Sequence, residues 1–267
     1  MKIVRFCSMR GELLYGVLHP DVPDTATVIS GDIFGDIEIS SRVERIKVFL
    51  PPVNPPNVIA LGLNYSRHAV ETGLHSPEIP VMFLKATSSV IGHKAPILLP
   101  SVGAHEVDHE AEPAVIIGKT AKNVSPDDAD EYVLGYTCAN DVSARDWQIH
   151  KQQKQWARGK SFDSFCPIGP YLVTKDEVAN PGTLKVRSIL NGEVMQDSNT
   201  SDMLFDIPAI ISNLSCSMTL LPGTVILTGT PDGVGFTRTP PVFLQHGDTI
   251  TISIENVGEL SNPVKRE

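Results

Sequence analysis

The sequence has few cysteines and no long apolar run. Its four cysteines lie far apart and form no C-x-x-C pair, which argues against a zinc site and predicts free, buried thiols in a reducing compartment. No stretch of about 18 consecutive apolar residues is present, so no membrane-spanning helix is expected. The segment Met1–Phe6 lacks the apolar core of a signal peptide and predicts a strand. We therefore expect a cytoplasmic protein without a membrane partner.

Basic residues are also fewer than acidic ones. Lys and Arg number 22 against 31 Asp and Glu, a net charge of −9, which argues against nucleic acid or an anionic membrane surface as a partner. An acidic small-molecule substrate is not excluded, because a bound divalent cation reverses the local sign of the charge. With 267 residues, 41% hydrophobic and 20% charged, the chain is expected to be globular, with one large domain and a small one.

A proline-rich segment divides the chain. Residues 51–56 contain four prolines, which cannot continue a helix or a central strand, so we expect a stiff, extended linker there. Residues 1–50 predict a small β-rich domain that begins with a hairpin of Lys2–Phe6 and Leu13–Leu18 around a turn at Gly11. Residues 57–267 would then form the second, larger domain.

Beyond the linker, strand signals dominate. Short apolar runs of strand length occur at Val58–Leu63, Val81–Leu84, Ala114–Ile117 and Thr224–Leu227, and Thr249–Ile254 alternates between apolar and polar residues. Helices are expected at Tyr65–Thr72, with Asn64 as N-cap, and from Asp206, with Pro208 in the first turn and Ile207, Ile210, Ile211 and Leu214 on one face. This pattern predicts an α+β protein that is predominantly β, with few helices.

An acidic cluster precedes one of these strands. Glu106, Asp108, Glu110 and Glu112 occupy alternate positions, and residues two apart in a strand point to the same face. Glu110 and Glu112 would therefore aim at one point, which Glu106 and Asp108 share if the strand extends back. Such a cluster is stable either as a solvated strand edge or around a hard cation such as Mg²⁺, Mn²⁺ or Ca²⁺. Asp141, after an apolar segment, would add a third carboxylate and leave coordination positions open for substrate.

Other polar residues suggest acid–base chemistry and anion binding. His68 and Glu71 are three apart on the first helix, so they would pair on one face, although a surface helix with an incidental pair has the same spacing. Arg145, Gln148 and Lys160 would hold a substrate carboxylate or a developing oxyanion, or else be ordinary surface groups. The Gly-rich turn at Gly229 and Thr230 lacks a phosphate-loop or dinucleotide signature, and serves either as a tight turn or as a donor to a small anion.

Together these segments resemble the fumarylacetoacetate hydrolase family, in particular its branch of domain-containing proteins. The resemblance covers about residues 57–260 and holds over many short segments in the family's order. These segments are Gly62–Glu71 (GLNYSRHAVE), Val81–Lys85, Glu110–Glu112 with Ile117–Lys119, Asn140–Gln148 (NDVSARDWQ), Lys160–Pro170 (KSFDSFCPIGP), Asn191–Glu193, Leu227–Gly235 (LTGTPDGVG), Gly247–Asp248 and Gly258–Leu260.

The resemblance implies a mixed β-roll or β-sandwich around the active site, in a homodimer. It implies Mg²⁺ or Mn²⁺ as cofactor, with Ca²⁺ as a substitute, held by Glu110, Glu112 and Asp141. His68 and Glu71 would form the dyad that activates water, with Lys160 as an electrostatic catalyst. The substrate would contact Tyr65, Arg145, Gln148, Gly229 and Thr230.

One position departs from the family's pattern. A leucine usually follows the second metal-binding glutamate, and this chain has Pro113. Proline removes a backbone donor. Either the strand lies at an edge there, or that backbone position faces away from its neighbour.

Three functions remain open from the sequence. The first is metal-dependent hydrolysis of a carbon–carbon bond in an acylpyruvate-type 1,3-dicarbonyl, with His68 activating water and Lys160 stabilising the oxyanion. The second is decarboxylation or tautomerisation of a β-keto acid such as oxaloacetate, with the dyad moving a proton between carbon and oxygen. The third, a non-catalytic binding protein with the same fold, predicts a missing ligand or dyad residue, and none is missing.

Overall fold

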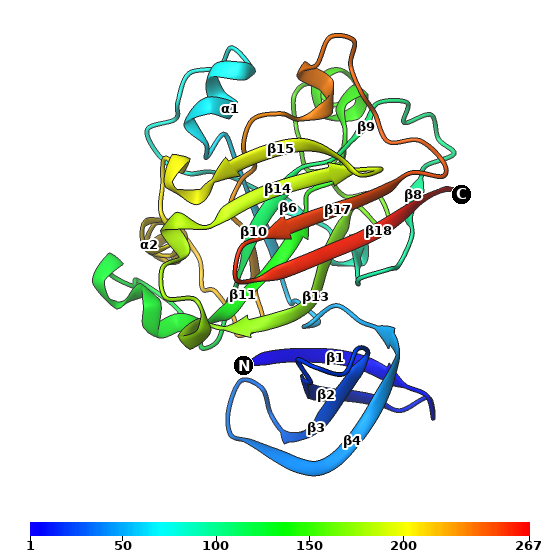
Figure 1. Ribbon diagram of the computed structural model, residues 1–267. Coiled ribbons are helices and arrows are strands. Elements are labelled where there is room, and N and C mark those ends of the chain that lie inside the picture. Colours follow the sequence, from blue (N-terminus) through cyan, green and yellow to red (C-terminus); the bar gives the residue numbers. More distant parts are fainter.

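The structure, a computed structural model, describes residues 1–267 and consists mainly of β-strands (Figure 1). The main sheet contains β1 (Lys2–Ser8), β2 (Leu13–Leu18), β3 (Thr25–Gly31), β4 (Ile37–Phe49), β5 (Val58–Gly62), β6 (Val81–Lys85), β7 (Val90–Ile91), β10 (Ala111–Ile117), β11 (Val133–Asn140), β13 (Cys166–Thr174) and β16 (Val225–Leu227). Its strand order is β2-β3-β4-β1-β13-β11-β10-β16-β5-β6, and β7 pairs with β13.

A second sheet packs against the first. It contains β8 (Ile97–Leu99), β14 (Lys185–Leu190), β15 (Glu193–Asn199), β17 (Thr249–Ile254) and β18 (Gly258–Arg266), in the order β15-β14-β17-β18-β8. A short ribbon pairs β9 (Val107–Asp108) with β12 (Ser143–Ala144). The predominantly β fold predicted from the sequence is confirmed.

Helical segments are few and short. The α-helices are α1 (Ser66–Glu71) and α2 (Ile207–Ser217), and a π-helical turn covers Asp146–Lys151. Single 3₁₀ segments occur at Thr87–Ser89, Pro126–Tyr132, Lys175–Glu177, Pro181–Thr183, Thr200–Asp202 and Gly235–Thr237. None of the helices is long and apolar enough to cross a membrane.

Strand β10 lies between the two parts of the core. All of its side chains are buried. Ala111, Val115 and Ile117 pack into the larger apolar cluster, which the second sheet shares, whereas Ala114 and Ile116 pack into a separate cluster. Because alternate strand residues point to opposite faces, Glu112 shares the face of Ala114 and Ile116.

The N-terminal strands form an antiparallel unit at one end of the molecule, drawn in blue in Figure 1. The predicted hairpin of β1 and β2 is present. The small core of the four-stranded N-terminal unit consists of Val4, Phe6, Ala26 and Ile46. Strand β1 also pairs with β13, so the sheet continues into the rest of the chain. A separate N-terminal domain, with a linker at residues 51–56, stays a prediction.

The predicted N-cap is present in one α-helix and absent from the other. Helix α2 begins as predicted, since the Asp206 carboxylate accepts a hydrogen bond from the Ala209 N–H at 2.9 Å. Helix α1 does not, because Tyr65 occupies the N-cap position without a side-chain cap. Asn64 instead donates to the backbone oxygens of Thr228 and Phe205 at 2.7 and 3.0 Å. The capping role predicted for Asn64 is therefore wrong.

Candidate active site

Three carboxylates meet where β10 begins and β11 ends. Glu110 precedes β10, Glu112 lies within it, and Asp141 follows β11, which pairs antiparallel with β10. One oxygen from each carboxylate lies within 4.8 Å of the others, and all three residues are buried. The Asp141 N–H donates to the Glu110 backbone oxygen at 2.9 Å, which fixes the two strand ends together.

Pro113 fits into this arrangement because its backbone nitrogen and oxygen face the side of β16, at the end of that strand. Strand β10 is not at an edge, because it pairs with β11 on one side and β16 on the other. The Pro113 oxygen accepts from the Thr228 N–H at 3.1 Å, just past the end of β16. Since the nitrogen and oxygen of one strand residue point to the same side, the missing donor costs no ladder bond between β10 and β11.

Two ammonium groups lie among the carboxylates. The Lys160 Nζ contacts Glu110 Oε2 at 2.8 Å and Asp141 Oδ2 at 2.7 Å. Lys85, which the sequence pattern did not indicate as part of the site, forms an ion pair with the other oxygen of Asp141 and is itself buried. The available signal was a lysine at the end of the apolar run Val81–Leu84, where a strand delivers a side chain to the edge of a sheet.

The buried charges do not balance. Four buried carboxylates, Asp108, Glu110, Glu112 and Asp141, face three buried cations, Lys85, Arg145 and Lys160, which leaves one negative charge in excess. The imbalance falls on Glu112: burial, and then the charges of Asp141 and Glu110, raise its pKa well above its usual range. At Glu110 burial acts in the same direction, but Lys160 and Arg145 outweigh it and lower the pKa.

This donor set fits a hard divalent cation. Glu112 Oε2 accepts from the Gly229 N–H at 2.7 Å, but its buried Oε1 has no hydrogen-bond partner. A buried oxygen with no partner, next to two further carboxylates, is the environment in which oxygen ligands gather around Mg²⁺ or Mn²⁺. Glu110, Glu112 and Asp141 could hold such an ion.

His68 and Glu71 form a pair beside these carboxylates. The His68 Nδ1 lies 3.2 Å from Glu71 Oε2. The other Glu71 oxygen accepts from the Gly233 N–H at 2.9 Å and from the Thr237 hydroxyl at 2.7 Å. Burial alone would raise the pKa of Glu71, but these hydrogen bonds lower it overall, so the carboxylate stays ionised and orients the imidazole.

Asp108 does not join the carboxylate cluster, contrary to the expectation of a shared face. Strand β9 ends at Asp108 and β10 begins at Ala111, so the alternation is broken between them. Asp108 Oδ2 instead accepts from Arg145 Nε and Nη2 at 3.0 and 2.9 Å and from the Phe236 N–H at 3.1 Å. Its Oδ1 accepts from the Gly235 N–H at 2.8 Å. Glu106 also lies outside the cluster of Glu110, Glu112 and Asp141.

Arg145 links this network to the site. Its Nη1 contacts Glu110 Oε1 at 2.6 Å and donates to Gln148 Oε1 at 2.9 Å. The Phe236 ring covers the guanidinium, with 4.4 Å between Cζ and the ring centroid. Gly235 must be glycine, because a Cβ there would lie 2.5 Å from Asp108 Oδ1 and 1.9 Å from the Val242 oxygen.

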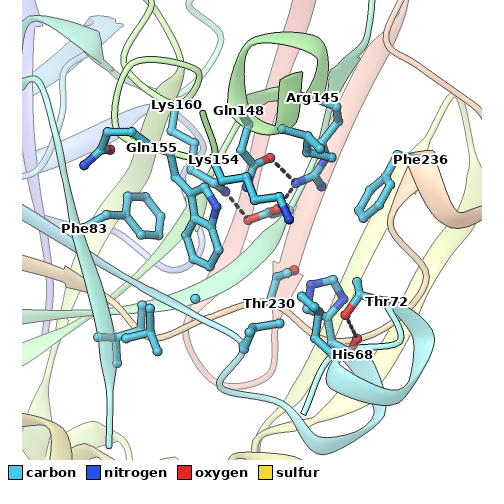
Figure 2. A pocket seen from close by; sticks show the side chains of 18 of the residues that line it. His68, Thr72, Phe83, Arg145, Gln148, Lys154, Gln155, Lys160, Thr230 and Phe236 are labelled. Atoms are coloured by element: carbon cyan, nitrogen blue, oxygen red, sulfur yellow. Dashed lines mark hydrogen bonds and ion pairs between the residues drawn. The ribbon is translucent and has the colours of Figure 1, made fainter. Parts of the chain in front are cut away.

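A cavity of about 530 Å³ opens over the site. Of the residues predicted from the sequence, it is lined by His68, Glu110, Arg145, Gln148, Lys160 and Thr230. Figure 2 shows the labelled side chains of this set around a common space, with His68 opposite Lys160. The volume lies within the ~300–1,000 Å³ of typical small-molecule pockets.

Two predicted substrate contacts lie behind the cavity lining instead. Tyr65 is fully buried and its hydroxyl has no hydrogen-bond partner; burial, and then the charge of Glu112, raises its pKa well above its usual range. Gly229 donates its N–H to Glu112, so it supports the carboxylate cluster. Thr230 donates its hydroxyl to the Ala111 oxygen at 3.1 Å, while its side chain reaches the cavity.

The apolar wall of the cavity was not predicted from the sequence. Phe83 and Trp156 meet edge to face, with ring centroids 5.8 Å apart. Gly62 makes room for the indole, because a Cβ at residue 62 would lie 2.1 Å from an atom of the Trp156 ring. The sequence signal was slight, since nothing in the spacing of residues 62, 83 and 156 indicates that they meet.

Two family models match this chain. Residues 57–265 match the family described as fumarylacetoacetate (FAA) hydrolase C-terminal, and residues 1–44 match one described as Rv2993c-like, N-terminal. The mitochondrial oxaloacetate tautomerase FAHD2A of Homo sapiens is 48% identical over 217 residues, which cover 81% of this chain and 69% of the relative. The mitochondrial oxaloacetate tautomerase fahd2 of Xenopus laevis is 48% identical over 220 residues, covering 82% and 69%.

Solved structures are similar over the whole length. The 5-carboxymethyl-2-hydroxymuconate delta-isomerase from Mycobacterium smegmatis is 41% identical with a TM-score of 0.87, covering 100% of both chains. A fumarylacetoacetate hydrolase from Exiguobacterium antarcticum is 37% identical with a TM-score of 0.87, again covering 100% of both. The extent of the family match and the identity to these relatives show that the chain belongs to the fumarylacetoacetate hydrolase family.

Proposed function

We propose that this protein is a tautomerase of a β-keto acid of the oxaloacetate type. The observation that carries the proposal is that His68, which contacts Glu71, and Lys160 line the same cavity. There they would act as base and oxyanion-stabilising cation. Keto–enol conversion needs a group that moves a proton between carbon and oxygen and a positive charge near the oxygen. The names of two relatives, an oxaloacetate tautomerase and a delta-isomerase, support this class of reaction.

The residues take complementary roles. With Nδ1 donating to Glu71, the imidazole has Nε2 free as its basic nitrogen. Nε2 takes the proton from the carbon next to the carbonyl, the C–H electron pair forms the carbon–carbon double bond, and negative charge moves to the oxygen. Lys160 stabilises that charge, and the proton on Nε2 then passes to the oxygen, so no atom is gained or lost.

Binding and orientation fall to other residues. Arg145 and Gln148 would hold the substrate carboxylate in the cavity. A divalent cation at Glu110, Glu112 and Asp141, with Mg²⁺ or Mn²⁺ the proposed ion, would supply Lewis-acid polarisation of the keto-acid oxygens. Phe83 and Trp156 form an apolar wall that limits access of water.

Hydrolysis of an acylpyruvate is the second candidate, because the same dyad suits it. A histidine oriented by a carboxylate also activates water for attack on a carbonyl. Tautomerisation and hydrolysis differ in whether an oxygen from solvent enters the product. The cytoplasmic location expected from the sequence stays a prediction, and the two tautomerase relatives have mitochondrial in their names.

The test uses both substrates with the Mg²⁺-loaded protein. We expect accelerated loss of the enol absorbance of freshly dissolved oxaloacetate, and no release of ¹⁸O-labelled acid from an acylpyruvate in labelled water. His68→Gln should lower the tautomerisation rate by about 10²–10⁴-fold, the usual contribution of a general base. His75→Gln, in an exposed histidine outside the cavity, should not change it. Rapid ¹⁸O incorporation without enol conversion would replace the proposal with hydrolysis.

A further inference from the structure

Lys154 is the cation of the cavity lining that has no acidic partner. Arg145 and Lys160, which also line the cavity, both form ion pairs with Glu110. They contact its two oxygens at 2.6 and 2.8 Å, whereas Lys154 forms no ion pair with Glu110. Glu110 is the only acidic residue in the lining, and Lys154 therefore lacks a counter-ion on the protein.

The local backbone turns this lysine toward the cavity. After the π-helical turn at Asp146–Lys151, Gln153 and Lys154 both adopt left-handed conformations, with φ of 50° and 64°. Two residues later Trp156 anchors the segment against Phe83. Figure 2 shows the Lys154 side chain reaching across the cavity toward Arg145.

We propose that Lys154 binds the second carboxylate of a dicarboxylic substrate. This inference rests on the proposed function, in which Arg145 and Gln148 hold the first carboxylate. The lining has three basic side chains, of which Arg145 and Lys160 are paired with buried carboxylates, so Lys154 is the basic group left for an anionic ligand. Such a cavity favours a dianion over a monoanion.

The neighbouring Lys151 provides a matched comparison. It lies on the same segment but outside the cavity lining, and its Nζ is already bound to Asp146 Oδ2 at 2.8 Å and to the Gly103 oxygen at 3.0 Å. Lys151→Gln and Lys154→Gln therefore remove the same charge from one segment. Only the second change removes it from the cavity.

The test measures binding of two ligands that cannot enolise, so it does not depend on turnover. Malate carries the 2-hydroxycarboxylate group of lactate and adds a second carboxylate. By calorimetry with the Mg²⁺-loaded protein, we expect malate to bind more tightly than lactate, and Lys154→Gln to raise the Kd of malate about tenfold without changing that of lactate. Lys151→Gln should change neither Kd, and added salt should reduce the preference for malate.

Three results would overturn the inference: no preference for malate in the unaltered protein, equal shifts for both ligands in Lys154→Gln, or no shift for malate. These results can be told apart from a failure of the proposed function. If oxaloacetate is not tautomerised but the malate preference depends on Lys154, the reaction is wrong and the subsite stands. If tautomerisation is present without that dependence, the subsite alone is wrong.

Discussion

At the scale of single residues, Glu112 combines the most burial with the least compensation. It has no ammonium or guanidinium partner, unlike Glu110 and Asp141, and one of its oxygens has no hydrogen-bond partner at all. Burying such a carboxylate costs stability unless a cation is bound. The free energy of unfolding should therefore depend strongly on divalent metal, and Glu112 should be the residue that creates the dependence.

Replacing Glu112 by Gln tests this directly. Gln keeps an oxygen for the Gly229 N–H but removes the charge, so the chelator-treated variant should be as stable as the unaltered protein or up to about 2 kcal/mol more stable. The rise in Tm on adding Mn²⁺ should disappear. Glu131→Gln, which removes an exposed glutamate paired with Lys119, should keep the full Mn²⁺ effect. A normal Mn²⁺ shift in Glu112→Gln would contradict the metal site.

His93 gives a prediction for the pH dependence of stability. Its Nδ1 accepts from the Ser261 N–H at 3.0 Å, and burial, followed by the charge of Lys94, lowers its pKa from 6.5 to about 4. Because the folded state resists protonation, this contribution to stability is present above pH ~6.5 and is lost as the pH falls toward 4. Because His93 is only partly buried, solvent screens part of this effect, and the loss should be about 1–2 kcal/mol.

Chemical denaturation at pH 7 and pH 4.5 measures this loss. His93→Asn keeps an acceptor for Ser261 but cannot titrate, so its stability should fall less between the two pH values. His246→Asn changes an exposed histidine whose Nδ1 also accepts a backbone hydrogen bond, and it should show the same pH dependence as the unaltered protein. Parallel curves for His93→Asn and the unaltered protein would rule out this role.

At the scale of elements, the loop after β16 supports two functional side chains at once. Its Gly233 and Thr237 hold Glu71, and its Gly235 and Phe236 bind Asp108, which in turn fixes Arg145. The Glu71 carboxylate and the Arg145 guanidinium therefore depend on one short segment. A change that loosens this loop should affect both.

Asp108→Asn is the sharpest test of that support. The amide would place N–H donors against the Arg145 guanidinium, so we expect a loss of about 3–5 kcal/mol in the free energy of unfolding, as for other broken buried pairs. KM for oxaloacetate should rise because Arg145 is no longer fixed. Asp130→Asn breaks the exposed pair with Lys175 and should cost less than about 1 kcal/mol without changing KM. An unaltered KM in a folded Asp108→Asn protein would show that Arg145 is positioned without it.

Features with a local cause could be predicted from the sequence, and those with a distant cause could not. The alternation at Thr249–Ile254 matches β17, and the period of two places Glu110 and Glu112 together. Asp108 has the same spacing, but the direction of its side chain depends on the strand break after it and on its ion pair with Arg145. Lys85 and Asp141 are 56 residues apart, and only the completed sheet brings them into contact.

At the scale of the whole molecule, the resemblance implies a homodimer, and the surface carries apolar side chains that a partner would cover. Val70, Ile79 and Leu84 are 79%, 66% and 51% exposed, and all lie in or near α1 and β6. Light scattering after size exclusion should give twice the chain mass of 29.0 kDa. A mass near 29.0 kDa at micromolar concentration would contradict the dimer.

The position of β10 between two separate apolar clusters has a consequence for folding. A shift of the strand by one residue would exchange its two faces. Glu112 would then point into the larger apolar cluster, where Val115 and Ile117 now pack, and would be separated from Asp141. Only the correctly paired chain can then bring the three carboxylates together. Because a ligand stabilises the state that binds it, divalent cations present during refolding should select the native pairing over its slipped alternatives.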